Sequence, residues 1–284
     1  MEVDAVPTVE VAAGTIEYTE QGAGPPVVLL HGLLMNQTVW DQVISQLPDG
    51  FRYLRPTLPL GAHRIPMHPD ADLSTRGQVQ VVADLLAALD LREVTLVHSD
   101  WGGGLFLTAY GLDSRVSRII VCPCEAFDNF PPGLPGKATK IARIPGGLWI
   151  ALHQLRVRWL RRLPLLLGQM AKYPLADDVV RSWTEPGLRD RRVRRDLRRY
   201  AVSLPAKAQL IADTEALQSF SGEALILWSP ENRVMPPEHG RRLAELIPRA
   251  RLREIGDAYV LSMLDQPAAV AQEITEFLVP SLRH

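Results

Sequence analysis

The chain has 284 residues, of which 46% are hydrophobic and 22% are charged, and its formal net charge is −1. This is an ordinary globular composition, and the length suits one large domain or two small ones. A net charge so close to zero gives no electrostatic argument for a nucleic-acid partner. The two cysteines, Cys122 and Cys124, are too few for a disulfide framework, so we expect both to be buried.

Two features of the sequence bear on its location. No apolar run approaches the roughly 20 residues that a membrane-spanning helix needs. The acidic start, MEVDAVPTVE, lacks the basic and apolar regions of a signal peptide. We therefore expect a cytoplasmic protein without a membrane span.

Strand and helix patterns alternate in the first and last parts of the chain. Short apolar or alternating runs predict strands, and apolar residues at helical spacing predict helices. The predicted strands are 9–12, 15–19, 27–30, 51–54, 94–97, 116–122, 224–228 and 252–255. The predicted helices are 36–47, 74–91, one that ends at Tyr110, 237–246 and 267–278. Strands that alternate with helices predict an α/β protein with a mostly parallel central sheet flanked by helices.

Residues 126–217 interrupt this alternation. The segment is rich in arginine, leucine and proline, shows no clear strand and predicts several short helices. Its most basic stretch, 189–199, contains two aspartates and an apolar pair at Val193 and Leu197, so we interpret it as a solvated helix. We therefore predict a core formed by residues 1–125 and 218–284. Residues 126–217 are predicted to form an all-helical cap over the carboxyl edge of the sheet, where such folds bind ligands.

Residues 97–103 (VHSDWGG) lie between a buried strand and a predicted helix. A sharp turn in this context can present one side chain at the start of the helix, as in a nucleophile elbow. Such a turn needs small residues two positions to either side of its centre. Around Ser99 these positions hold valine and tryptophan, whereas around Asp100 they hold His98 and Gly102. Asp100 is therefore the favoured nucleophile, and helix capping is the alternative role of its carboxylate.

Four motifs in the expected order resemble the α/β-hydrolase superfamily over nearly the full chain. His31-Gly32, after a buried strand, resembles the oxyanion motif, and residues 100–103 (DWGG) are similar to the aspartate elbow of haloalkane dehalogenases and epoxide hydrolases. Residues 232–236 (NRVMP) resemble the turn that bears the catalytic acid, and residues 256–267 resemble the loop that bears the catalytic histidine. The resemblance implies an α/β-hydrolase fold.

The resemblance also assigns roles near the turn. It implies that the backbone N–H groups of Leu33 and Trp101 form an oxyanion site and that His31 supports the loop through its position beside Gly32. In the dehalogenases the tryptophan after the nucleophile also donates its indole N–H to the halide. Their second halide donor is often an asparagine, where this chain has Leu33.

The acid and histidine positions depart from the family pattern. Asn232 stands at the acid position, and an amide cannot stabilise an imidazolium by charge, so Glu125 and Glu231 are the alternative acids. Val260 stands at the histidine position. The adjacent Tyr259 replaces a glycine, and a phenol is a hydrogen-bond donor but not a base at neutral pH.

His98, beside the turn, is a possible displaced base, although packing under the turn is the simpler role. Loss of a triad histidine costs about 10⁴–10⁶ in rate. An aspartate is ionised without help, but hydrolysis of its ester needs a base to activate water.

We therefore predict an enzyme that acts on an apolar small molecule with Asp100 as nucleophile or acid/base in a non-standard triad. The reaction is hydrolysis or a non-hydrolytic step such as elimination, isomerisation or cyclisation. One alternative is an inactive relative that binds a small molecule or a partner, and another is a hydrolase inactivated at position 260. No cofactor and no metal are expected, and the expected assembly is a monomer or a homodimer.

Overall fold

The computed structural model describes residues 6–100, 104–203 and 205–279 of the chain. Its centre is an eight-stranded sheet with the order β1-β2-β4-β3-β5-β6-β7-β8. Strand β2 pairs antiparallel with β1 and with β4, and the other neighbouring pairs are parallel. This confirms the predicted mostly parallel sheet. The strands are β1 (Thr8–Val11), β2 (Gly14–Gln21), β3 (Pro26–Leu29), β4 (Arg52–Pro56), β5 (Val94–Asp100), β6 (Val116–Cys124), β7 (Glu223–Trp228) and β8 (Ala250–Glu254).

The central strands are the most deeply buried. All seven residues of β5 are buried, which is typical of a parallel strand covered on both faces. The two cysteines of β6 are buried free thiols, as the sequence predicted. The register of β5 and β6 pairs Asp100 with Cys124, so the carboxyl ends of these strands lie side by side.

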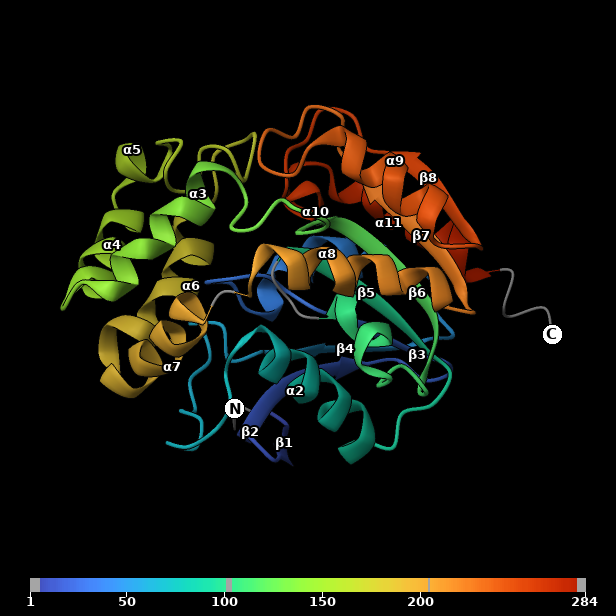
Figure 1. Ribbon diagram of the computed structural model, residues 1–284, viewed down its shortest axis with the longest axis horizontal. Helices are drawn as coiled ribbons and strands as arrows, with labels where there is room; N and C mark the ends of the chain where they lie inside the picture. Colours follow the sequence, from blue (N-terminus) through green and yellow to red (C-terminus); the bar gives the residue numbers. More distant parts are fainter. Residues whose placement is uncertain (1–5, 101–103, 204, 280–284) are drawn as a thin grey trace.

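The helices outside the insertion surround the sheet (Figure 1). Helix α2 begins after Ser74, whose hydroxyl accepts a hydrogen bond from the N–H of Gly77, a typical N-cap contact. The core helices are α1 (Asp41–Ile44), α2 (Thr75–Ala88), α9 (Pro237–Leu246), α10 (Ser262–Asp265) and α11 (Pro267–Leu278). The predicted helices 74–91, 237–246 and 267–278 are therefore confirmed within a few residues.

Two predicted core helices differ from the structure. The helix expected over 36–47 is divided into a 3₁₀ turn, η1 (Gln37–Trp40), followed by the short α1. Asn36 caps the first turn, because its side chain accepts the N–H of Thr38. The Trp40 indole donates to the carbonyl of Leu30 and so ties this turn to the segment that follows β3. The helix expected to end at Tyr110 consists, where it is described, of two 3₁₀ turns, η2 (Gly104–Phe106) and η3 (Thr108–Tyr110).

The described residues between β6 and β7 form helices and turns without a strand, in agreement with the prediction. The helices are α3 (Gly133–Ala138), η4 (Thr139–Arg143), α4 (Gly147–Leu155), α5 (Arg158–Arg161), α6 (Asp177–Arg189), α7 (Arg191–Val202), α8 (Lys207–Glu215) and η5 (Ala216–Ser219). Figure 1 shows that α3 to α7 gather at one end of the sheet, whereas α8 runs alongside the strands.

Two buried carboxylates join this helical segment to the core. Asp196 of α7 accepts the N–H of Met67 at 2.9 Å and lies 3.3 Å from Nε2 of His63. Asp265 of α10 accepts the N–H groups of Lys172 and Tyr173, which precede α6. Because these contacts are charge-assisted and shielded from solvent, they fix the helical segment over the sheet edge.

Candidate active site

Asp100 ends β5 in the left-handed backbone region, with φ of 54°, and its side chain is buried. Its Oδ2 accepts the N–H of Leu33 at 2.9 Å. The loop that carries Leu33 approaches closely because Gly32 has no side chain: a Cβ there would lie 2.1 Å from Oδ2 of Asp100. The backbone N–H that the sequence assigned to an oxyanion site therefore holds the Asp100 carboxylate itself.

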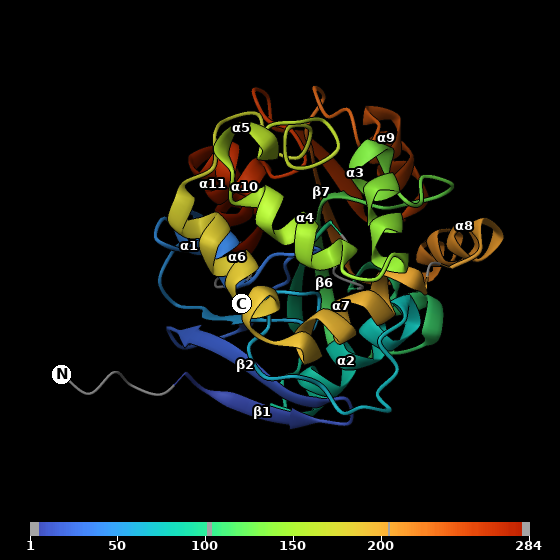
Figure 2. The ribbon, with the colours of Figure 1, turned by 90° about the vertical axis from the view of Figure 1, so that its left-hand side faces the viewer.

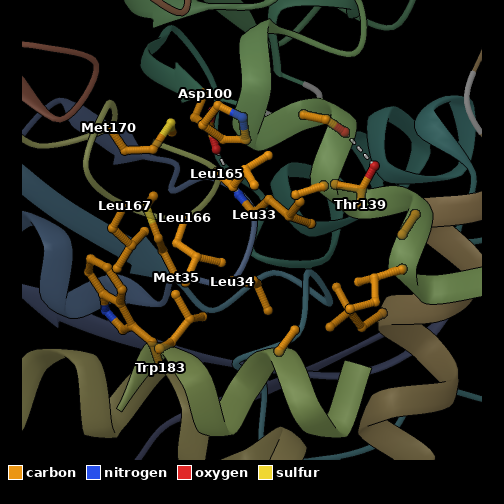
Figure 3. Close-up of a pocket in the computed structure, with 18 of the residues that line it drawn as sticks. Leu33, Leu34, Met35, Asp100, Thr139, Leu165, Leu166, Leu167, Met170 and Trp183 are labelled. Atoms are coloured by element: carbon orange, nitrogen blue, oxygen red, sulfur yellow. Dashed lines mark hydrogen bonds between the residues drawn. The ribbon is translucent and has the colours of Figure 1, made fainter. Parts of the chain in front are cut away.

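A cavity of about 120 Å³ lies between the sheet edge and the cap. Asp100 is the single ionisable side chain among the described residues that line it, and most of the others are apolar. In Figure 3 the core loop 33–35 faces Met170, Trp183 and residues 165–167 of the cap. Ser99, the alternative nucleophile, is buried and is not one of the lining residues. This arrangement is a small, largely apolar pocket with one carboxylate.

Glu125 follows β6 directly and is fully buried. Neither of its carboxylate oxygens has a hydrogen-bond partner among the described residues. Burial, together with the nearby charge of Asp100, raises the pKa of Glu125 well above its usual value. Two carboxylates that share a low-dielectric site cannot both ionise easily, so this arrangement favours the protonated form of Glu125 while Asp100 is charged.

The histidines near the site differ in their surroundings. His31 has structural contacts on both nitrogens: Nε2 accepts the N–H of Leu58 at 2.8 Å, and Nδ1 lies 2.8 Å from the carbonyl of Gly32. Burial lowers the pKa of His31 to about 4. His98 is also buried, with no hydrogen-bond partner for either nitrogen among the described residues, and burial lowers its pKa to about 3. Both rings are therefore neutral at physiological pH, and neither lines the cavity.

The structure places the two acid-position residues in other contacts. Oδ1 of Asn232 accepts the N–H groups of Val234 and Met235 and so closes its own turn. Glu231 lies 2.5 Å from the Lys172 ammonium and is 45% exposed. The ion pair with Lys172 lowers the pKa of Glu231. Neither residue is among those that line the cavity.

The loop that resembles the histidine-bearing loop is tied to the core. Val260 is fully buried, and the N–H of Tyr259 donates to Asp265 at 3.0 Å. The Tyr259 ring lies 5.9 Å from the Arg233 guanidinium, and neither 259 nor 260 lines the cavity. Trp101, assigned as an oxyanion and halide donor, lies outside the described residues, so its roles stay predictions.

Tyr200 of α7 is a candidate that the sequence analysis did not identify. It is buried, and its pKa is raised well above the usual value by burial and by the charges of Glu125 and Asp100. Its inward direction was available from the sequence, because Tyr200 continues the apolar stripe of Val193 and Leu197 at helical spacing. The sequence did not indicate that Tyr200 lies near two carboxylates of the core.

Within the described part of the chain, no group of three or more histidine, cysteine, aspartate or glutamate side chains is arranged to hold a metal ion. In the same residues no helix has the length and apolar character to span a bilayer.

Comparison with known proteins defines the class to which this fold and site belong. The model of the alpha/beta hydrolase family matches residues 27–273, so the chain belongs to that family. It is 25% identical over 281 residues to a 2-hydroxy-6-oxo-2,4-heptadienoate hydrolase of Pseudomonas putida, covering 94% of this chain and 95% of the relative. It is 24% identical over 279 residues to a cis-3-alkyl-4-alkyloxetan-2-one decarboxylase of Shewanella oneidensis, covering 93% of this chain and 85% of the relative.

Shorter matches have higher identity. A haloalkane dehalogenase of Mesorhizobium japonicum is 34% identical over 122 residues, which is 41% of this chain and 42% of the relative. An uncharacterized protein of Mycobacterium tuberculosis is 37% identical over 101 residues, and this match spans 35% of the chain but only 29% of that protein.

Solved structures share the fold. An esterase from Thermogutta terrifontis superposes with a TM-score of 0.72 at 21% identity, covering 97% of this chain and 98% of the esterase. A meta-cleavage product hydrolase from Pseudomonas fluorescens superposes with a TM-score of 0.74 at 20% identity, covering 97% of this chain and 98% of the hydrolase. These likenesses confirm the α/β-hydrolase fold.

Proposed function

We propose that this protein is an enzyme that acts on an apolar small molecule, with Asp100 as the reacting group in a triad that lacks histidine. The observation that carries the proposal is the placement of Asp100. It is the single ionisable side chain among the described lining residues of an otherwise apolar cavity, with one carboxylate oxygen held by a backbone N–H. We also infer that α3 to α7, within residues 126–217, act as the cap that closes this cavity.

In the nucleophilic form of the reaction, a carboxylate oxygen of Asp100 attacks an electrophilic carbon of the substrate. A carbon–oxygen or carbon–halogen bond breaks, the leaving group takes the electron pair, and an ester forms on Asp100. The N–H of Leu33, 2.9 Å from Oδ2, stabilises negative charge on that oxygen before the attack and polarises the ester carbonyl after it. Apolar surroundings strengthen this interaction because their effective dielectric constant is low.

Hydrolysis of such an ester needs a base that activates water. None of the described lining residues other than Asp100 can serve as one. His98 is neutral but does not line the cavity, and Val260 has no basic group. We therefore propose that the natural reaction does not include the histidine-assisted hydrolysis step of the family.

A non-hydrolytic reaction fits this site best. The Shewanella relative, which aligns with 93% of this chain, is named as a decarboxylase. Loss of carbon dioxide from a lactone ring consumes no water, so it does not need the base that this cavity lacks. An elimination, an isomerisation or a cyclisation shares that property.

Glu125 is the proposed partner of Asp100 in place of the family acid. It does not line the cavity, so we assign it a positioning role. By holding a proton, Glu125 leaves the negative charge of the pair on Asp100, the carboxylate that faces the substrate. Glu231 is the less suitable substitute because it pairs with Lys172 at the surface.

The test is mass spectrometry of the intact protein after exposure to alkyl halides, epoxides, esters and β-lactones. We expect a covalent adduct on Asp100 that persists for hours, and no adduct in the isosteric Asp100→Asn variant. Absence of both adduct and turnover, in the unaltered chain and in Val260→His, would refute a nucleophilic role.

A second candidate function is binding without catalysis. It is favoured by the apolar lining of the cavity, whose described residues include no base besides Asp100. In that case an apolar ligand is retained with the same affinity in the unaltered chain and in Asp100→Ala. Turnover that depends on Asp100 excludes this function. A cytoplasmic location and a monomeric or homodimeric state stay predictions.

A further inference from the structure

The nearly neutral chain divides into two regions of opposite charge. Residues 126–217 contain 17 lysines and arginines but only 8 aspartates and glutamates. The rest of the chain contains 14 lysines and arginines and 24 aspartates and glutamates. The cap therefore carries a formal excess of nine positive charges, which the total of −1 conceals. A local excess of this size attracts anionic partners to the cap.

The exposed large hydrophobic side chains lie in the same region. All ten of them within the described residues fall between Leu134 and Val202. Trp159 is 69% exposed, Ile144 is 61% exposed, and Trp149 is 48% exposed. Single exposed apolar residues are ordinary, but their concentration in one helical segment favours an interaction surface on that segment. Tryptophan in particular suits a boundary between water and an apolar phase.

A groove of about 270 Å³ brings the basic and the apolar residues together. Its lining includes Ile144, Trp149 and four arginines of α7, which are Arg191, Arg194, Arg195 and Arg198. Arg191 and Arg198 are exposed, and neither forms an ion pair with a described carboxylate. The planar guanidinium matches the oxygens of a phosphate, so this groove suits a phosphate-bearing partner.

The surface formed by α4, α5 and α7, with the segment 163–165, is called here the outer cap face. Figure 2 looks onto this side of the molecule, where α4 lies in front of the sheet with α5 above it and α7 below it. Leu165 is 51% exposed on this face and also lines the active-site cavity. The apolar part of the outer cap face is therefore continuous with the wall of the cavity.

We propose that the outer cap face docks on the surface of a lipid bilayer that contains anionic phospholipids. Arg191 and Arg198 contact the phosphates, while Trp149 and Trp159 enter the interfacial region, as in amphipathic interfacial segments. A bilayer supplies both phosphate charge and hydrocarbon. The acidic core of a second copy offers charge but no exposed large hydrophobic side chain among its described residues, and a nucleic-acid duplex offers no hydrocarbon to the apolar side chains.

The test is flotation of the full chain with vesicles of phosphatidylcholine alone or of equal parts phosphatidylcholine and phosphatidylglycerol. We expect binding to the anionic vesicles that weakens as salt increases. Arg191→Gln with Arg198→Gln should weaken the partition coefficient about 30-fold, at about one kcal/mol per charge. The matched control, Arg241→Gln with Arg253→Gln, removes two half-exposed arginines of the core and should leave binding within twofold.

The apolar contribution is tested separately. Trp149→Ala with Trp159→Ala should weaken binding at least fivefold and abolish the blue shift of tryptophan fluorescence that vesicles produce. Asp100→Ala should bind like the unaltered chain, so the outcome does not depend on the proposed chemistry of the cavity.

Several results would overturn the proposal. They are equal binding to neutral and anionic vesicles, no binding to either, and equal loss of binding in the control arginine variant. Full displacement from vesicles by inorganic phosphate, where sodium chloride of the same ionic strength displaces little protein, would show a site for a soluble anion instead. Binding to duplex DNA or concentration-dependent dimerisation without vesicle binding would assign the face to those partners.

Discussion

Replacement of Glu125 by glutamine should make the stability of the protein less dependent on pH. Glu125 is fully buried beside Asp100, and no described residue provides either of its oxygens with a hydrogen bond. Burial and the charge of Asp100 raise its pKa, so the folded state keeps a proton that the unfolded chain releases above about pH 4.3. Glutamine has nearly the same shape as the protonated acid but does not titrate.

The sign and the size of the effect follow from proton linkage. Above the unfolded pKa the folded state binds one more proton than the unfolded state, so the free energy of unfolding falls as pH rises. The slope is about 1.4 kcal/mol per pH unit until Glu125 itself ionises in the folded state. If Glu125 stays protonated to pH 7, Glu125→Gln should gain about 2.7 kcal/mol relative to the unaltered chain between pH 5 and pH 7.

The assay is urea unfolding of both proteins at half-unit steps from pH 5 to pH 8, with the difference in free energy of unfolding plotted against pH. Groups common to both proteins cancel in this difference. Because the two carboxylates titrate as a pair, adding Asp100→Asn should shorten the pH range over which the difference grows.

Glu231→Gln is the matched control. Hydrogen bonding to Lys172 lowers the pKa of Glu231, so that side chain stabilises the fold above its unfolded pKa, and this contribution is lost as pH falls. Its difference curve should therefore change below about pH 4.3 and be flat from pH 5 to pH 8. A flat curve for Glu125→Gln over pH 5–8 would refute the protonated state of Glu125.

Three further predictions concern the contacts around the site and the cap. Gly32→Ala should abolish adduct formation and cost about 1–3 kcal/mol of stability, because the new Cβ overlaps the carboxylate of Asp100; undiminished labelling in an intact-mass assay would contradict the close approach. Asp196→Ala should destabilise the protein by about 1–3 kcal/mol at pH 7, since it leaves the N–H of Met67 without its acceptor. Burial alone would raise the pKa of Asp196, but hydrogen bonds from His63 and Met67 outweigh it and lower the pKa overall. The stability that this carboxylate contributes is therefore lost as pH falls below about 3.9. The free-energy cost of Asp196→Ala should shrink when denaturation is measured in that range. Asp265→Ala should free the segment before α6 and raise amide hydrogen exchange at Lys172 and Tyr173, whose N–H groups lose their acceptor; unchanged exchange there would show that other contacts hold this segment.

The sequence alone determined most of the architecture. Apolar runs and their alternation with helical patterns predicted the strands of the sheet and the helices 74–91, 237–246 and 267–278, because strand and helix periodicities are local properties. The absence of strand patterns over 126–217 predicted the helical segment. The turn at Asp100 was also visible locally, because it depends on residues only two positions away. The local pattern was less accurate over 36–47, where a 3₁₀ turn tied to the core by the Trp40 indole precedes a short α-helix.

Only the tertiary structure decided the surroundings of Asp100. The register of β5 and β6 brings Glu125 beside Asp100, and α7 brings Tyr200 to the same place. Glu231 pairs with Lys172, 59 positions away in the chain, and is therefore the less suitable substitute for the catalytic acid. The outer cap face likewise depends on which sides of α4 and α7 turn away from the sheet. These arrangements depend on strand pairing and on packing between segments far apart in the chain, which local spacing does not encode.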